Sequence, residues 1–251
     1  MPMLVNKSPK LFAIALCFLL SACSSQPSLE STAVTPIIAV PDNPQDLGVL
    51  SAYSDPWEGF NRRMYYFNAK ADEYVLLPIV TGYKQITPDV VETGLSNFFN
   101  NLAEISTFIN SLLQFKLSVA GETLGRFAVN TTLGLAGLID VATPIGLAAQ
   151  DEDFGQTLGF WGVKAGPYLV LPLLGPSSLR DASGLVFDSL ADQQVMDELG
   201  MKSEEELYLS LLNSIDVRAR LPFRYYGSGS AFEYDYLKLL YKKYREIQVA
   251  R

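Results

Sequence analysis

The chain has 251 residues, a formal net charge of −8, no histidine and two cysteines. Without histidine it has no Ser-His-Asp or Cys-His nucleophile pair and no imidazole metal ligand. The acidic balance argues against a nucleic-acid partner, which would need a basic face. Hydrophobic residues make up 49% of the chain and charged residues 18%, which is apolar for a water-soluble domain.

The N-terminus reads as a secretory signal peptide over residues 1–22. Two lysines precede the apolar run Leu11–Leu20, which is too short to cross a membrane as a helix. The string LSAC ending at Cys23 resembles the bacterial lipobox, in which the cysteine is acylated and becomes the new N-terminus. The alternative is ordinary cleavage, with Cys23 as a bystander. Serines rather than aspartate follow the cysteine, which suggests, by resemblance to lipoprotein sorting signals, release to the outer membrane.

Residues 23–52 are expected to form a lipidated flexible tether. They are rich in proline and serine and contain no aromatic residue before Tyr53. Such a composition cannot bury a core. A single folded domain is therefore expected over residues 53–251.

The domain reads as all-α, because no period-two alternation is sustained after residue 55. One amphipathic helix is expected from Trp57 to Val75. Further helices are expected over about 96–116, 118–131, 178–191, 203–218 and 230–247, with short helical pieces near 88–94 and 151–158.

Four sequence signals mark helix starts. Asp55-Pro56 and Thr87-Pro88 each place a capping residue before a proline at the first helical position. The segments that begin at Ser178 and Ser203 fit capping boxes.

The helix near 96–116 combines a wide apolar stripe with a nearly uncharged polar one. The polar line contains Asn97, Asn100, Asn101, Glu104, Thr107, Ser111 and Gln114. This polar line would forbid exposure to lipid on all sides. Three alternatives stay open: a helix lying in a membrane interface, a bundle helix whose polar face borders a wet cavity, and a buried core helix.

The segment 154–181 is dense in glycine and proline, which break regular helix and permit close backbone approach. It is expected to form a buried re-entrant turn, an apolar lip or a rigid core loop.

Charge is unevenly distributed along the C-terminal half: residues 140–216 hold 13 acids and 3 bases, whereas residues 217–251 hold 8 bases and 3 acids. The basic end either steers toward anionic headgroups or an acidic partner, or is a solvated amphipathic helix.

No catalytic constellation is present. The chain has no GxSxG, no P-loop and no dinucleotide fingerprint. The acids of 151–153 lack the spacing of a calcium loop and are expected at a helix N-terminus. No catalytic residue, cofactor or metal is expected.

Several motifs in chain order resemble the MlaA (VacJ) lipoproteins. The opening DPWEGFNRRMYYFN of 55–68 is followed by GLSNFFNNL (94–102), RFAVNTTLG (126–134) and GLIDVA (137–142). FGQTLGFWGV (154–163), GPY (166–168) and GPSSLRD (175–181) complete the set. The match weakens beyond residue 190.

The resemblance implies a ring-like helical body seated in the inner leaflet of the outer membrane of Gram-negative bacteria. Through an amphipathic channel it lets phospholipids misplaced in the outer leaflet pass to a soluble periplasmic carrier, and an inner-membrane ABC transporter then receives them. The family associates with trimeric porins, and no covalent chemistry occurs.

By motif position, eight residues are candidates for the channel or its gate. They are Asn61, Phe67, Asn68, Asn97, Asn101, Gly159, Gly162 and Gly166. Each has a plainer alternative role in core packing. Two rival functions remain: a scaffolding envelope lipoprotein without a lipid channel, and a phospholipase-like enzyme, which the missing histidine disfavours.

Overall fold

We describe the protein from a computed structural model, in which the described residues are 55–198 and 200–251. They belong to one compact unit. The expected signal peptide (1–22), the lipidation site Cys23 and the tether (23–52) lie outside the described residues.

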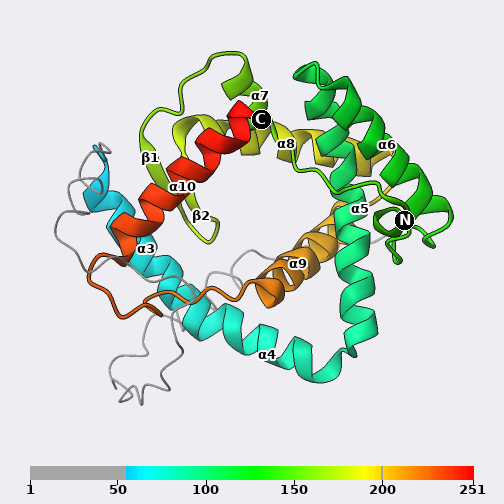
Figure 1. The fold of residues 1–251 in the computed structure, drawn as a ribbon. Coiled ribbons are helices and arrows are strands. Elements are labelled where there is room, and N and C mark those ends of the chain that lie inside the picture. The colour runs from blue at the N-terminus through cyan, green and yellow to red at the C-terminus, as the bar shows by residue number, and fades with distance from the viewer. Residues whose placement is uncertain (1–54, 199) are drawn as a thin grey trace, which may run out of the picture. The chain divides into compact units, whose positions relative to one another are not determined.

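The described chain is mainly helical, as expected for an all-α fold (Figure 1). Its elements are α3 (Glu58–Ala71), a π-helical turn (Asp72–Leu76), α4 (Leu77–Ile86), α5 (Asp89–Leu113), α6 (Leu117–Thr132), a 3₁₀ turn (Thr143–Ile145), α7 (Phe154–Phe160), β1 (Tyr168–Leu171), β2 (Gly175–Ser178), α8 (Leu179–Glu198), α9 (Ser203–Arg220) and α10 (Glu233–Ala250).

Helices α6 to α10 lie within a few residues of the expected ranges, apart from the longer C-terminal end of α8. The piece expected near 88–94 and the helix expected at 96–116 are one continuous α5. The expectation missed α4, which follows the π-helical turn without a break and carries Pro78 near its start.

Two of the expected helix caps are wrong. The N-cap of α3 is Trp57 rather than Asp55, and no side chain caps it. Asp55 instead accepts a hydrogen bond from the amide of Asn61. The N-cap of α5 is Pro88 rather than Thr87.

Capping hydrogen bonds are present at both expected capping boxes, one of them shifted by one residue. The Ser178 hydroxyl accepts a hydrogen bond from the backbone N–H of Asp181 at 3.1 Å, as a cap of α8 should. At α9 the box begins one residue earlier than expected, because the Glu205 carboxylate accepts from the backbone N–H of Lys202 at 3.0 Å.

The glycine- and proline-rich segment holds an antiparallel hairpin, which the sequence did not predict. Tyr168 pairs with Ser178 and Leu171 with Gly175. The first strand, YLVL, is apolar throughout, so the sequence shows no polar/apolar alternation there. Tyr168 and Val170 are fully buried, whereas Leu173 at the tip of the hairpin is exposed.

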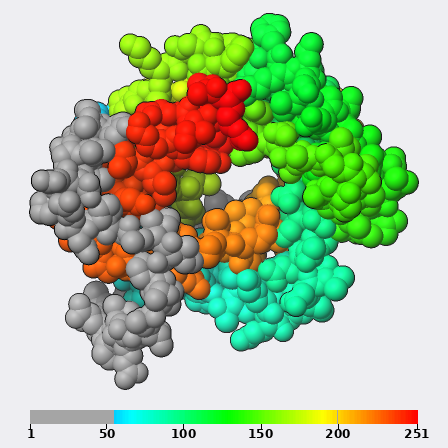
Figure 2. Space-filling model, in the orientation of Figure 1, coloured from blue at the N-terminus to red at the C-terminus, as the bar shows by residue number. Residues whose placement is uncertain are grey.

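Helices pack both on their neighbours in the sequence and on distant helices. α5 packs on α6, α7 on α8, and α9 on both α4 and α5, while α10 contacts α7 and β2. Figure 2 shows an opening bordered by α10, α9, α5 and the α6–α7 segment.

Candidate functional site

The polar side of α5 faces inward. Six polar residues on this helix are buried: Ser96, Asn101, Glu104, Thr107, Asn110 and Ser111. Ile109 and Leu112 of the same helix are exposed. Among the three alternatives for this segment, the burial pattern favours a bundle helix with a polar inner face.

Large apolar side chains cover much of the outer surface instead. On α8 they are Leu179, Leu185, Val186, Phe187 and Leu190, and on α3 they include Phe60 and Phe67. A water-soluble protein buries such residues and exposes its polar ones. The reversed pattern suits a body whose outside meets hydrocarbon and whose inside holds polar groups. No described helix has the length and apolarity needed to cross a membrane.

A buried ion pair joins α5 to α6. The Arg126 guanidinium donates from Nε to Glu104 Oε1 at 2.6 Å, and both side chains are buried. Arg126 also donates to the Thr143 hydroxyl at 3.1 Å and the Leu147 carbonyl at 2.5 Å. Burial raises the pKa of Glu104, although Arg126 opposes that shift. This pair therefore fixes the loop that follows α6 against the polar face of α5.

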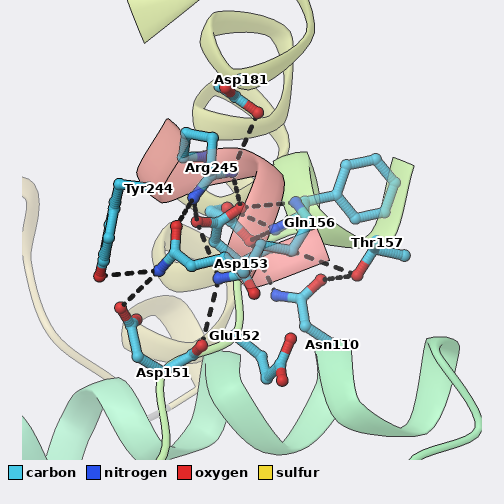
Figure 3. Close-up of polar contacts among 12 residues, drawn as sticks. Asn110, Asp151, Glu152, Asp153, Gln156, Thr157, Asp181, Tyr244 and Arg245 are labelled. Atoms are coloured by element: carbon cyan, nitrogen blue, oxygen red, sulfur yellow. Dashed lines mark hydrogen bonds and ion pairs between the residues drawn. The ribbon is translucent and has the colours of Figure 1, made fainter. Parts of the chain in front are cut away.

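A second polar cluster holds α10 against α7 and α8 (Figure 3). Arg245 of α10 donates to Asp153 Oδ2 at 2.6 Å and to Asp181 Oδ1 at 2.9 Å. Burial opposes ionisation of Asp181, but hydrogen bonds from Arg245 and Tyr241 overcome it and lower the pKa of this carboxyl to about 2. The cluster is therefore charged at neutral pH.

The same cluster reaches α5 through the side-chain amides of Asn110 and Gln114 (Figure 3). The Thr157 hydroxyl donates to the Asn110 carbonyl at 2.8 Å, and the Asn110 amide donates to Asp188 at 3.1 Å. The Gln114 amide donates to Glu152 at 2.9 Å. Polar contacts, rather than a continuous apolar core, therefore hold these helices together.

Two of the proposed gate residues attach α3 to the hairpin. Asn61 is 0% exposed; its amide donates to the Tyr168 carbonyl at 3.0 Å, and its side-chain carbonyl accepts from Val170 N–H at 2.8 Å. Asn68 lies two helical turns after Asn61. Its amide donates to the Leu171 carbonyl at 2.8 Å, and its side-chain carbonyl accepts from Leu173 N–H at 2.7 Å. Both amides hold the hairpin in register with α3.

The other proposed gate residues are scattered. Phe67 of α3 is 47% exposed. Asn97 donates to the Leu138 carbonyl at 3.1 Å, and Asn101 donates to the Thr131 hydroxyl at 2.9 Å. The Asn101 side-chain oxygen is buried without a hydrogen-bond partner among the described residues.

The three proposed glycines have different surroundings. A Cβ at Gly159 would lie 2.7 Å from Arg180 Nη1 and from a Val249 methyl, so this glycine permits close packing of α7. Gly162 has φ +89° and open space around it. Gly166 has φ +70° and lies against Leu179. The structure does not bring these glycines and the asparagines of α3 and α5 into one site.

An amphipathic cavity of about 380 Å³ lies between α5, α8 and α9. Its apolar lining includes Phe99, Leu102, Ile105, Val195, Met196 and Leu209, and its polar lining includes Asp192, Gln193, Glu206 and Asn213. No basic side chain lines it. Burial and the neighbouring Asp188 raise the pKa of Asp192. Its apolar side chains suit acyl chains, whereas its two carboxylates would repel the phosphate of a headgroup.

Sequence reasoning missed the ionic contacts of Arg126, Asp181 and Arg245. The partners of Arg245 lie 92 and 64 positions away, so no local pattern marks them. Asp153 does occupy the expected helix N-terminus, where its carboxylate accepts from Gln156 N–H at 2.8 Å. Among the described residues, no group of three or more acidic or cysteine side chains is placed to hold a metal ion.

Comparison with known proteins gives concordant matches. The family model of the MlaA lipoprotein matches residues 53–248. An uncharacterised protein of Rickettsia typhi is 40% identical over 149 residues, which cover 59% of each chain. The intermembrane phospholipid transport system lipoproteins MlaA of Shigella flexneri and Escherichia coli K12 are each 41% identical, over 55% and 54% of this chain and 56% and 55% of their own.

The chain thus matches less than two thirds of the length of these curated relatives. A solved structure described as the structural basis for maintenance of bacterial outer membrane lipid asymmetry matches with a TM-score of 0.66 and 32% identity. That match covers 78% of this chain and 99% of the solved one. From the family model and these relatives, the chain belongs to the MlaA lipoprotein family.

Proposed function

We propose that this chain is an outer-membrane lipoprotein that forms an amphipathic passage for phospholipids. It removes phospholipids misplaced in the outer leaflet, passes them to a periplasmic carrier protein and so maintains lipid asymmetry. The names of the curated relatives and the subject of the solved structure support this assignment.

The observation that carries the proposal is the reversed polarity of the helices. Exposed Phe187 and Leu190 on α8 suit contact with acyl chains, while buried Asn101 and Glu104 on α5 line the interior with polar atoms. A phospholipid that crosses a leaflet needs a polar track for its headgroup and an apolar exit for its tails. The opening seen in Figure 2 and the cavity between α5, α8 and α9 supply candidates for both.

We further propose the placement that the sequence predicts. Acylated Cys23 anchors the chain, residues 23–52 act as a tether, and the domain 53–251 sits in the inner leaflet beside a trimeric porin. Passage of a lipid forms and breaks no covalent bond, so the proposed role is transport and not enzymatic catalysis.

A rival reading makes the protein a scaffolding lipoprotein of the envelope. That reading requires no bound lipid and no dependence on the interior cavity. The exposed apolar surface fits either role, whereas the amphipathic cavity between α5, α8 and α9 favours transport.

The test is the phospholipid content of the full chain purified from membranes, with transfer of labelled phospholipid to the periplasmic carrier. Ala103 lines the cavity, so Ala103→Trp should obstruct it and reduce transfer several-fold. Ala231→Trp, at an exposed site before α10, is the matched control. A wild-type chain that neither carries nor transfers phospholipid would exclude the transport function.

The anchor has its own test. Cys23→Ala should abolish labelling by palmitate and release the protein from the membrane fraction, unless the apolar surface alone retains it. A Cys17→Ala variant serves as the control, because Cys17 lies within the expected signal peptide. Continued palmitate labelling of Cys23→Ala would exclude this lipidation site.

A further inference from the structure

The charged side chains that line the cavity between α5, α8 and α9 are all of one sign. They are the carboxylates of Asp192 on α8 and Glu206 on α9. Neither carboxylate forms an ion pair with a base of the described chain, and Lys202, four positions before Glu206, is no exception. The cavity therefore holds acidic groups that the described residues leave without a counter-ion.

Glu206 also has an unused hydrogen-bonding atom. Its Oε1 is buried and has no hydrogen-bond partner among the described residues. The first turn of α9, in which Glu206 lies, favours an ionised carboxylate through the helix dipole. Leaving a buried acceptor unpaired costs free energy, which a donor brought by a ligand would recover.

Asp192 lacks positive charge in its surroundings as well. Burial and the neighbouring Asp188 raise the pKa of Asp192, and no basic side chain opposes this shift. Asp188 differs in that it accepts hydrogen bonds from the Asn110 amide at 3.1 Å and from Phe154 N–H at 3.0 Å. A cation beside Asp192 would stabilise its ionised form.

The wall that α5 contributes to this cavity is entirely apolar. It consists of Phe99, Leu102, Ala103 and Ile105, and Phe99 is buried. Both acids come from the other two helices. The volume of about 380 Å³ is within the range of sites that bind small organic ligands. A ligand that matches both walls carries positive charge at one end and an apolar chain at the other.

We propose that this cavity binds an alkylammonium group, whose N–H groups donate to Asp192 and Glu206 and whose carbon chain lies against α5. An ammonium group suits the two acids because it is a compact cation with several N–H donors, which form charge-assisted hydrogen bonds to carboxylates. An inorganic cation would satisfy the acids and leave the apolar wall of α5 without a partner.

Two sources can supply this chemistry: the ethanolamine headgroup of a phospholipid and a free amphiphilic amine. In the headgroup a short ethylene link separates the ammonium from the phosphate, so the ammonium can reach the carboxylates while the phosphate stays farther from them. The first source rests on the proposed transport function and gives the protein a preference for aminophospholipids. The second source does not rest on that function.

The experiment titrates the full-length protein, at neutral pH and in a neutral detergent, with three probes. They are dihexanoyl-phosphatidylethanolamine, dihexanoyl-phosphatidylglycerol and decylamine, each below its micelle concentration. The test variant is Asp192→Asn with Glu206→Gln, which removes both charges and preserves side-chain size. The matched control is Asp197→Asn with Glu204→Gln, which changes exposed acids of the same two helices that do not line the cavity.

The test variant should bind the amine probes about tenfold more weakly or worse, whereas the control variant should bind them as the wild type does. The charge-conserving variant Asp192→Glu with Glu206→Asp should keep most of the affinity, which separates lost charge from a damaged fold. Variant-sensitive binding of the ethanolamine lipid, tighter than that of the glycerol lipid, supports the site with the headgroup as its ligand. Variant-sensitive binding of decylamine alone supports the site with a free amine as its ligand.

Three results would each exclude the site. In the first, neither amine probe binds the wild type. In the second, the amide variant binds both amines as tightly as the wild type does. In the third, the charge-conserving variant loses as much affinity as the amide variant. Transfer of labelled phospholipid to the carrier is measured separately, so a chain that transfers lipid without using these acids would keep the proposed function and lose this site.

Discussion

Arg126 on α6 donates to Glu104 on α5 across 2.6 Å, with both side chains almost completely withdrawn from solvent. Such a pair contributes more to the specific arrangement of the two helices than to net stability, since each charge loses its hydration. Replacing only one residue of the pair is nevertheless costly, because the charge of the other residue then stays buried without a partner.

Arg126→Ala should therefore lower the free energy of unfolding by about 3–5 kcal/mol. The control is Arg62→Ala, whose partners Glu58 and Asp235 lie on the partly exposed surface, where a cost of about 0–1 kcal/mol is expected. Chemical denaturation in a mild detergent measures both. Equal costs for the two variants would contradict a buried, uncompensated Glu104.

The amide of Asn61 should determine how firmly the hairpin is attached to α3. Asn61→Ala leaves the Val170 N–H and the Tyr168 carbonyl without this partner, at about 1–3 kcal/mol for each buried group that water does not reach. Hydrogen exchange of the Val170 amide should accelerate. Asn100→Ala, at an exposed position of α5, should not alter it.

Acid should weaken the α10 attachment through Asp181. Its folded pKa of about 2 lies below the ordinary value of 3.8, so the stabilisation it provides is complete above about pH 4 and disappears as the pH falls through about 2. The gap in melting temperature between wild type and Asp181→Asn should be widest near neutral pH and should close toward pH 2. A gap that is constant from pH 6 to pH 2 would contradict the ionised state of Asp181.

Close packing of α7 on α8 should be sensitive to a single methyl group at Gly184. A Cβ there would lie 2.4 Å from Gly155 N and 2.7 Å from Gly155 Cα, which are backbone atoms that cannot rotate away. Gly184→Ala should cost about 1–3 kcal/mol or more. Gly159→Ala meets only the ends of Arg180 and Val249 side chains and should cost less. Melting temperatures of the two variants test the order.

The exposed face of α8 should promote attachment to bilayers. Replacing Val186, Phe187 and Leu190 by serine removes three exposed apolar side chains while leaving the buried Arg180 and Gly184 unchanged. Flotation with phospholipid vesicles should show weaker binding for a chain that also carries Cys23→Ala. Ser203→Ala with Ser214→Ala on α9 is a control that removes no apolar surface.

The sequence predicted most helices because their apolar stripes recur at helical spacing, and it predicted the polar line of α5 for the same reason. It did not indicate that Asn61 and Asn68 bind the backbone of a hairpin more than 100 positions away. The hairpin escaped prediction since its strands are short and contain Gly175 and Pro176, which carry no strand signal. The ion pairs of Arg126 and Arg245 depend on tertiary proximity, which periodicity does not encode.

The π-helical turn between α3 and α4 lets one continuous helical stretch pack against two different neighbours. A regular α-helix advances about 100° per residue, so one additional residue in a turn rotates everything after it by about that angle. α3 consequently faces the hairpin while α4, without any loop in between, faces α9. Asp72, at the first position of the turn, is held by Arg218 of α9 with Oδ2 2.8 Å from Nη2. The wider turn thus rotates the packing face of the helix, so that one continuous stretch contacts the hairpin with its first half and α9 with its second.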